Sequence, residues 1–90
     1  MNGLSEVDAR RKRLKIRAWR RGIKEMDLIL GGYADEKLSE MSDGELSLFE
    51  AMLGENDHDL YSWVTGQQEA PPRFGPLIQI LGERAAGIRG

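Results

Sequence analysis

Five apolar series with helical spacing, separated by glycine or proline, constrain this chain more than any other feature. In each series apolar residues recur every three or four positions, as they do on the buried face of a helix. The expected helices begin near residues 6, 23, 43, 57 and 76, and the turns between them are short. The sequence therefore predicts an all-α protein, a compact five-helix bundle in which residues 1–90 form a single domain.

The third helix has the clearest start signal. Ser42 is placed as its N-cap, and Glu45 follows three residues later, which is the spacing of a capping box. Met41 and Leu46 flank the cap at the positions of a hydrophobic staple. Gly54 supplies a C-terminal stop.

Other helix boundaries are marked in the same way. Ser5 is a cap for a first helix ending near residue 19, and Asn56 or Asp57 is a cap for the fourth. Residues 67–75 are expected to form a loop, because paired prolines there lack amide donors. Pro76 suits the first position of the fifth helix.

The second helix contains an unfavourable pair, Gly31-Gly32. Each glycine costs about 1 kcal/mol relative to alanine inside a helix, so a bend or break is possible there. The expected core is formed by the apolar faces of all five helices: Leu14, Ile23, Met26, Leu30, Leu46, Phe49, Leu53, Leu60, Trp63, Val64, Leu77, Ile80 and Leu81.

Composition narrows the classes of function. The chain has 90 residues and no cysteine, which excludes disulfides and thiolate chemistry and leaves little room for an enclosed substrate cavity. No apolar run approaches the roughly 20 residues that span a bilayer, and charged residues interrupt the N-terminal segment, so no membrane insertion is expected. We expect a cytoplasmic protein, and a monomer because no helix shows sustained heptads.

The net charge of -2 conceals an uneven distribution. Residues 1–24 hold nine basic and two acidic side chains, whereas residues 25–59 hold eleven acidic side chains and one lysine. Such a two-ended surface can orient an encounter with a charged partner.

Catalytic and metal sites find little support. His58 is the only histidine, and its acidic neighbours Asp57 and Asp59 fan out around a helix instead of converging on one ion. Gly31-Gly32 lacks the Gly-Lys-Ser/Thr pattern of a phosphate loop. We therefore predict a protein that is not an enzyme, with no catalytic residue and no metal or cofactor ligand.

Nucleic-acid binding is the physical rival to protein binding. Residues 10–24 form a basic segment that includes Trp19, and basic helices can follow a phosphate backbone. The acidic half of the chain would repel the same phosphates, so protein binding is favoured over nucleic acid.

The segment from Arg20 to Asp27 stands at the boundary between the two charge blocks. Gly22 is unfavourable in an ordinary helix, so it forms either a turn or a bare patch that another protein's backbone can approach. If the segment were helical, Arg21 and Glu25 would be four residues apart and could pair. If Gly22 forms a bare patch, these two side chains make polar contacts with the partner on either side of it.

Three blocks of sequence, taken in order, resemble the small bacterial flavinylation factors called SdhE, which are homologous to a mitochondrial succinate dehydrogenase assembly factor. Residues 19–27 look like the family's Arg-Arg-Gly-x-x-Glu-hydrophobic-Asp signature, the RGxxE motif. Residues 38–53 are similar to its third-helix segment, and residues 57–66 to its Asp-x-Asp-Leu-x-x-Trp-hydrophobic stretch.

The resemblance implies a five-helix chaperone that binds the flavoprotein subunit of succinate dehydrogenase, and in some bacteria that of fumarate reductase. Such factors promote covalent attachment of FAD to a histidine of that subunit, so FAD is bound by the partner and not stably by this chain. Some members of the family have also been labelled antitoxins, which leaves a regulatory protein as the alternative. Carried over by position, the partner-binding residues are Arg20, Arg21, Gly22, Glu25 and Asp27.

Overall fold

The computed structural model describes residues 5–89, and this part of the chain contains five α-helices and no strand. The α-helices are α1 (Glu6–Trp19), α2 (Lys24–Lys37), α3 (Asp43–Leu53), α4 (Asp57–Val64) and α5 (Gly75–Arg89). Two short 3-10 helices, η1 (Leu38–Glu40) and η2 (Pro72–Phe74), precede α3 and α5. The all-α prediction is confirmed. None of the described helices is both long and apolar enough to cross a bilayer.

The helix caps form as the sequence predicts. The Ser5 hydroxyl accepts the backbone N–H of Asp8, and α1 spans the expected residues. At the start of α3, Ser42 and Glu45 form both hydrogen bonds of a capping box. The Asn56 side chain caps α4 by accepting the N–H of His58. Local polar signals therefore fix where these helices begin.

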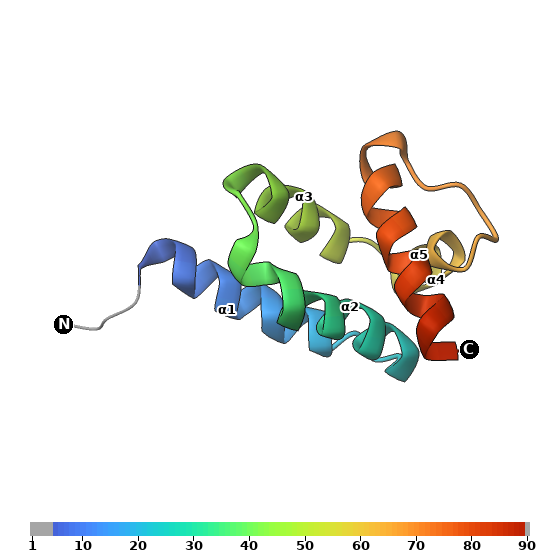
Figure 1. The fold of residues 1–90 in the computed structure, drawn as a ribbon, viewed down its shortest axis with the longest axis horizontal. Coiled ribbons are helices and arrows are strands. Elements are labelled where there is room, and N and C mark those ends of the chain that lie inside the picture. The colour runs from blue at the N-terminus through green and yellow to red at the C-terminus, as the bar shows by residue number, and fades with distance from the viewer. Residues whose placement is uncertain (1–4, 90) are drawn as a thin grey trace.

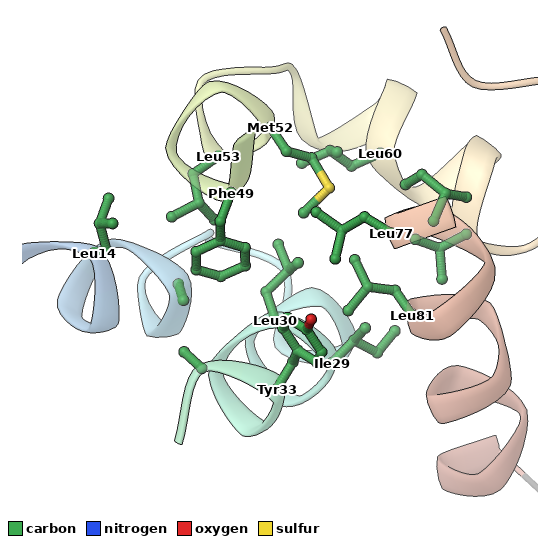
Figure 2. Close-up of a cluster of buried hydrophobic side chains, with 14 of the residues drawn as sticks. Leu14, Ile29, Leu30, Tyr33, Phe49, Met52, Leu53, Leu60, Leu77 and Leu81 are labelled. Carbon is green, nitrogen blue, oxygen red and sulfur yellow. The ribbon is translucent and has the colours of Figure 1, made fainter. Parts of the chain in front are cut away.

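Helices α1 and α2 form an antiparallel hairpin, and the other helices pack on one side of it (Figure 1). α3 lies over α1, while α4 and α5 contact each other and α5 also contacts α2. Figure 2 shows the side chains that fill the space between them, with Leu30, Phe49, Leu60 and Leu81 pointing toward a common centre. These four side chains are fully buried.

Aromatic rings close two parts of this core. The rings of Tyr33 and Phe49 lie 5.8 Å apart, and those of Trp63 and Phe74 lie 6.1 Å apart, both within the range of favourable aromatic contacts. Phe74 is fully buried although it lies in the segment predicted to be a loop. The segment contains η2, whose third residue is Phe74, so it contributes to the core instead of only connecting helices.

The orientation of α5 differs from the prediction. Ile80 was expected in the core but is 48% exposed, whereas Ile78 is buried. The buried stripe of α5 runs from Leu77 and Ile78 to Leu81, on the side that packs against α4 and α2. Both stripes have helical spacing, so only the packing of α5 on its neighbours decides between them. The helix also begins at Gly75, one residue before Pro76.

Helix α2 runs without a break through Gly31 and Gly32. A Cβ atom at Gly31 would lie within 3.0 Å of three ring carbons of Trp19, and one at Gly32 would lie 3.1 Å from an Arg84 nitrogen. The glycines therefore allow α1 and α5 to approach α2 closely. No break forms at the two glycines, because this packing offsets the low helix propensity of glycine.

Candidate functional site: the turn between the first two helices

Gly22 lies in the turn between α1 and α2 and has a φ of +90°, a conformation that favours glycine. It is exposed, and a Cβ atom at this position would meet no other atom within 4 Å. The backbone therefore requires glycine, and the space above it is open. The turn interpretation of Gly22 is confirmed, and its use as a patch that another protein approaches stays a prediction.

Arg21 points into the protein. Its guanidinium donates to Asp57 Oδ1 at 2.7 Å, to the Leu53 carbonyl at 2.5 Å and to the Glu55 carbonyl at 2.8 Å. The side chain is only 11% exposed. Leu53 ends α3, so Arg21 satisfies a carbonyl at a helix C-terminus, where positive charge is also favourable. Arg21 thus joins the α1–α2 turn to the α3–α4 connection by hydrogen bonds.

Asp27 holds the same turn from the other side. Its Oδ1 accepts the backbone N–H of Arg21 at 2.6 Å. It lies in the first turn of α2, where a negative charge is favoured by the helix dipole. Arg21 and Asp27 together fix the path of the chain across Gly22.

Glu25 and Arg20 face outward to different degrees. Glu25 is half-buried, and its Oε1 accepts the Tyr61 hydroxyl at a long 3.3 Å. Arg20 is exposed, and its side chain makes no hydrogen bond or ion pair among residues 5–89, although its backbone N–H donates to the Arg17 carbonyl. Arg21 and Glu25 do not pair, because the condition for pairing is not met: Arg21 precedes α2, which begins at Lys24.

A partly apolar hollow lies where the last residue of α1 meets α2 and α5. It has a volume of about 410 Å³ and is lined by Trp19, Leu28 and Ile88, with Arg84 and Glu36 also at its wall. The three apolar side chains are 36%, 40% and 44% exposed. Leu28 was not singled out by sequence reasoning. The sequence did hold a signal for Leu28. It is apolar but lies outside the buried stripe of α2 that contains Met26 and Leu30, which places it toward the surface.

The polar wall of the hollow is held by an ion pair. Arg84 donates two hydrogen bonds to the Glu36 carboxylate, which keeps the pKa of that carboxyl below its ordinary value. Trp19 Nε1 donates to Asp35 Oδ1 at 3.2 Å. The buried Arg84 Nε has no partner in the described part of the chain. These contacts orient the wall of the hollow against α2.

Part of the basic block of the sequence pairs with the acidic block. Arg10 of α1 binds Glu50 of α3 at 2.8 Å, and Lys15 lies 3.4 Å from Asp35. The Arg11 guanidinium donates to the carbonyls of Leu38 and Met41. The surface is therefore less two-ended than the sequence suggests, because much of the basic run serves to join helices.

No set of three or more His, Cys, Asp or Glu side chains within residues 5–89 is grouped as metal ligands would be. His58 is exposed at the start of α4. The surface formed by Arg20, Gly22 and Glu25 is hereafter called the turn surface.

Comparison with known proteins points to one family. Residues 12–85 match the model of the family described as "Flavinator of succinate dehydrogenase". The succinate dehydrogenase assembly factor 2 of Candida glabrata, a mitochondrial protein, is 41% identical over 66 residues, which is 73% of this chain and 43% of that protein. The protein of the same name from Debaryomyces hansenii is 38% identical over 84 residues, covering 88% of this chain and 59% of the relative.

A third protein of that name, from Schizosaccharomyces japonicus, is 43% identical over 64 residues, 71% of this chain and 45% of its own length. The chain thus spans about half the length of the relatives it matches. The matched region contains the α1–α2 turn and most of the core, so the likeness covers both the fold and the turn surface.

Proposed function

This chain belongs to the family of succinate dehydrogenase flavinators, and we propose that it binds the flavoprotein subunit of succinate dehydrogenase and promotes covalent attachment of FAD to that subunit. The family match over residues 12–85 is the observation that carries the proposal. The flavoprotein of fumarate reductase is a further partner of the same kind.

The turn surface is the proposed contact with the flavoprotein. Gly22 leaves open space through which a partner's backbone can come close, and Arg20 and Glu25 stand beside it as polar contacts. Arg21 and Asp27 hold the turn in shape from within, so we assign them a positioning role. That Arg21 itself touches the partner remains a prediction.

In this proposal the chain acts by positioning and not by chemistry of its own. FAD and the acceptor histidine both belong to the flavoprotein, and the bond forms between them. Holding two groups in a reacting orientation removes much of the entropic cost of bringing them together. A factor that must leave afterwards needs an interface of moderate size.

The proposal is tested by measuring covalent flavin on the partner. Cells that lack their own flavinylation factor would carry each variant of this chain, and flavin fluorescence of the flavoprotein band would be read on a denaturing gel. Glu25→Ala should lower the fluorescence by at least about fivefold, since it removes a contact in the proposed interface. Tyr61→Phe is the matched control because it removes the same internal hydrogen bond and leaves the carboxylate. Equal fluorescence from Glu25→Ala and wild type would refute the assignment of Glu25.

Gly22 needs a variant that separates its role in the turn from its proposed role in the contact. Asparagine tolerates positive φ better than other side chains, so Gly22→Asn fills the open space with limited backbone strain. We expect Gly22→Asn to lower flavinylation while the chain still unfolds cooperatively near the wild-type midpoint. Flavinylation at the wild-type level in this variant would contradict a close approach at Gly22.

The remaining assignments follow from the same proposal. The chain is proposed to be a monomer that is not an enzyme, inserts in no membrane and holds no FAD stably by itself. The cytoplasmic location stays a prediction, and the relatives are named as mitochondrial proteins. Fractionation of cells expressing the tagged chain decides the compartment.

A further inference from the structure

A second, apolar pocket lies between α3 and the first half of α5, which diverge from one another in Figure 1. Its volume is about 160 Å³. An apolar cavity of roughly 150 Å³ can hold a benzene ring, so this pocket has room for one bulky side chain. Seven of its lining residues are apolar or aromatic and one is acidic: Tyr33, Met41, Leu48, Phe49, Pro76, Leu77, Ile80 and Glu45.

Ile80 stands at the edge of this pocket and is 48% exposed. The apolar series of α5 assigns it to the core, yet the described chain leaves about half of it exposed. Leu48 of α3, which is half-buried, lines the same pocket. Single exposed apolar side chains are ordinary, but here one adjoins a hollow whose walls are already apolar. An apolar group inserted from outside would bury both side chains.

A polar hollow adjoins the apolar pocket. The two share Tyr33, Met41 and Glu45, and Lys37 and Glu40 complete the second hollow. Two carboxylates and one ammonium group leave one net negative charge. The bonds from Ser42 lower the pKa of Glu45, so this carboxylate is charged at neutral pH. Burial raises the pKa of Tyr33, whose hydroxyl remains protonated.

This charge selects among possible occupants. A net negative rim repels phosphate groups and attracts a cation. The apolar pocket accepts one side chain and not an extended lipid tail, because its volume is that of a single ring. A polypeptide that carries an apolar side chain next to lysine or arginine meets both requirements.

We propose that the pocket between α3 and α5 is a second docking site, which receives a bulky apolar side chain of a partner polypeptide while an adjacent basic side chain of that partner lies in the acidic hollow. None of its lining residues belongs to the turn surface. The site is therefore independent of the proposed contact at Gly22, and either can exist without the other.

Peptide titration of the full chain, followed by two-dimensional NMR of its backbone amides, tests this site. The probe is N-acetyl-phenylalanyl-arginine amide. Two matched peptides replace arginine by glutamate or phenylalanine by serine. We expect saturable shifts at Tyr33, Leu48 and Ile80 with the first peptide, and at least about fivefold weaker binding of either matched peptide. Absence of saturable shifts, or equal binding of the three peptides, would overturn the proposal.

Variants of the chain provide the second arm. Ile80→Ser removes the exposed apolar edge, and Glu45→Gln removes the charge while glutamine can still complete the capping box. Each should weaken binding of the phenylalanyl-arginine peptide by about fivefold or more. Ile16→Ser is the matched control, because Ile16 of α1 is equally exposed, at 47%, and does not line the pocket. A loss with Ile16→Ser as large as that with Ile80→Ser would count against the site.

Discussion

Arg20 and Arg21 are neighbours in the sequence, but their side chains have opposite surroundings. Arg20 is exposed, whereas the guanidinium of Arg21 binds a carboxylate and two backbone carbonyls in a nearly buried setting. Buried polar groups that lose such a partner stay unpaired. The resulting loss in the free energy of unfolding is larger than the net contribution of the hydrogen bonds themselves. The two arginines of the signature therefore serve different purposes, one outside and one inside.

Replacing Arg21 by alanine should lower the free energy of unfolding by about 3 kcal/mol. The change leaves Asp57 and the carbonyls of Leu53 and Glu55 without their donor. Urea denaturation followed by circular dichroism measures the effect. Arg20→Ala is the matched control and should change stability by less than about 0.5 kcal/mol. Equal stability of the two variants would contradict the structural role of Arg21.

At the scale of helices, close packing explains residues that look unfavourable one at a time. Gly31 lowers the helix propensity of α2. Because it has no Cβ atom, however, the ring of Trp19 can pack directly against that helix. The Trp19 ring also reaches Asp35 one turn further along α2. The α1–α2 hairpin is thus held by a contact that only glycine permits.

Gly31→Ala should destabilise the protein by about 2 kcal/mol although alanine is the better helix former. The new methyl group would overlap the Trp19 ring, so the ring or α1 must shift. Gly44→Ala is the control, since Gly44 lies in α3 with nothing within 4 Å of the added Cβ. It should leave stability unchanged or raise it. Thermal unfolding of both variants compares them, and a Gly31→Ala variant as stable as Gly44→Ala would refute the packing argument.

The capping box of α3 predicts a dependence on pH. Bonds from Ser42 lower the pKa of Glu45 from its ordinary value of 4.5. A carboxyl whose pKa is lower in the folded protein contributes stability above its unfolded pKa and loses it as the pH falls through the folded pKa. We therefore expect wild-type stability to fall more steeply below about pH 4.5 than that of Glu45→Gln, whose side chain does not titrate.

Urea denaturation of both proteins between pH 3 and pH 7 measures this difference. The other acidic groups are the same in the two proteins, so their contribution cancels in the comparison. Parallel curves for the two proteins over the whole range would show that Glu45 adds nothing to the acid response.

The limits of prediction from sequence also lie at the scale of helices. The starts of α1, α3 and α4 could be predicted because Ser5, Ser42 and Asn56 bond within a few residues of themselves. The rotation of α5 about its own axis could not be predicted. Ile78 and Ile80 both fit a helical stripe, and only packing on other helices decides which of them is buried.

The candidate site shows the same division. The exposed glycine turn could be located from the unfavourable glycine at a helix junction. The inward direction of the Arg21 side chain could not be predicted, because its hydrogen-bond acceptors are 32 to 36 residues away in the sequence. A partner that is distant along the chain leaves no local pattern.

For the molecule as a whole, internal pairing changes the meaning of the charge blocks. Arg10, Lys15 and Arg17 lie within 4.0 Å of carboxylates of α2 or α3, so their charges are partly neutralised. The surface field of the basic helix is weaker than its sequence implies. A phosphate backbone would meet acidic side chains beside most of these basic groups.

We accordingly expect the protein to bind DNA more weakly than a dissociation constant of about 10⁻⁴ M at physiological salt, the weak limit of ordinary non-specific binding. Fluorescence anisotropy of a labelled 20-base-pair duplex measures the affinity, at low and at physiological salt. Tight binding that falls steeply with salt would instead support the nucleic-acid alternative.

The three bonds of Arg21 also decide what kind of epitope the α1–α2 turn is. Residues 20–27 are contiguous, but their shape is set by Leu53, Glu55 and Asp57, which belong to another part of the chain. A synthetic octapeptide with this sequence would lack those acceptors and would sample many conformations in solution. The segment is therefore contiguous in sequence, but its conformation depends on the folded protein, as that of a discontinuous epitope does. An inhibitor that imitates it must reproduce the turn as a cyclised or grafted loop, not as a free peptide.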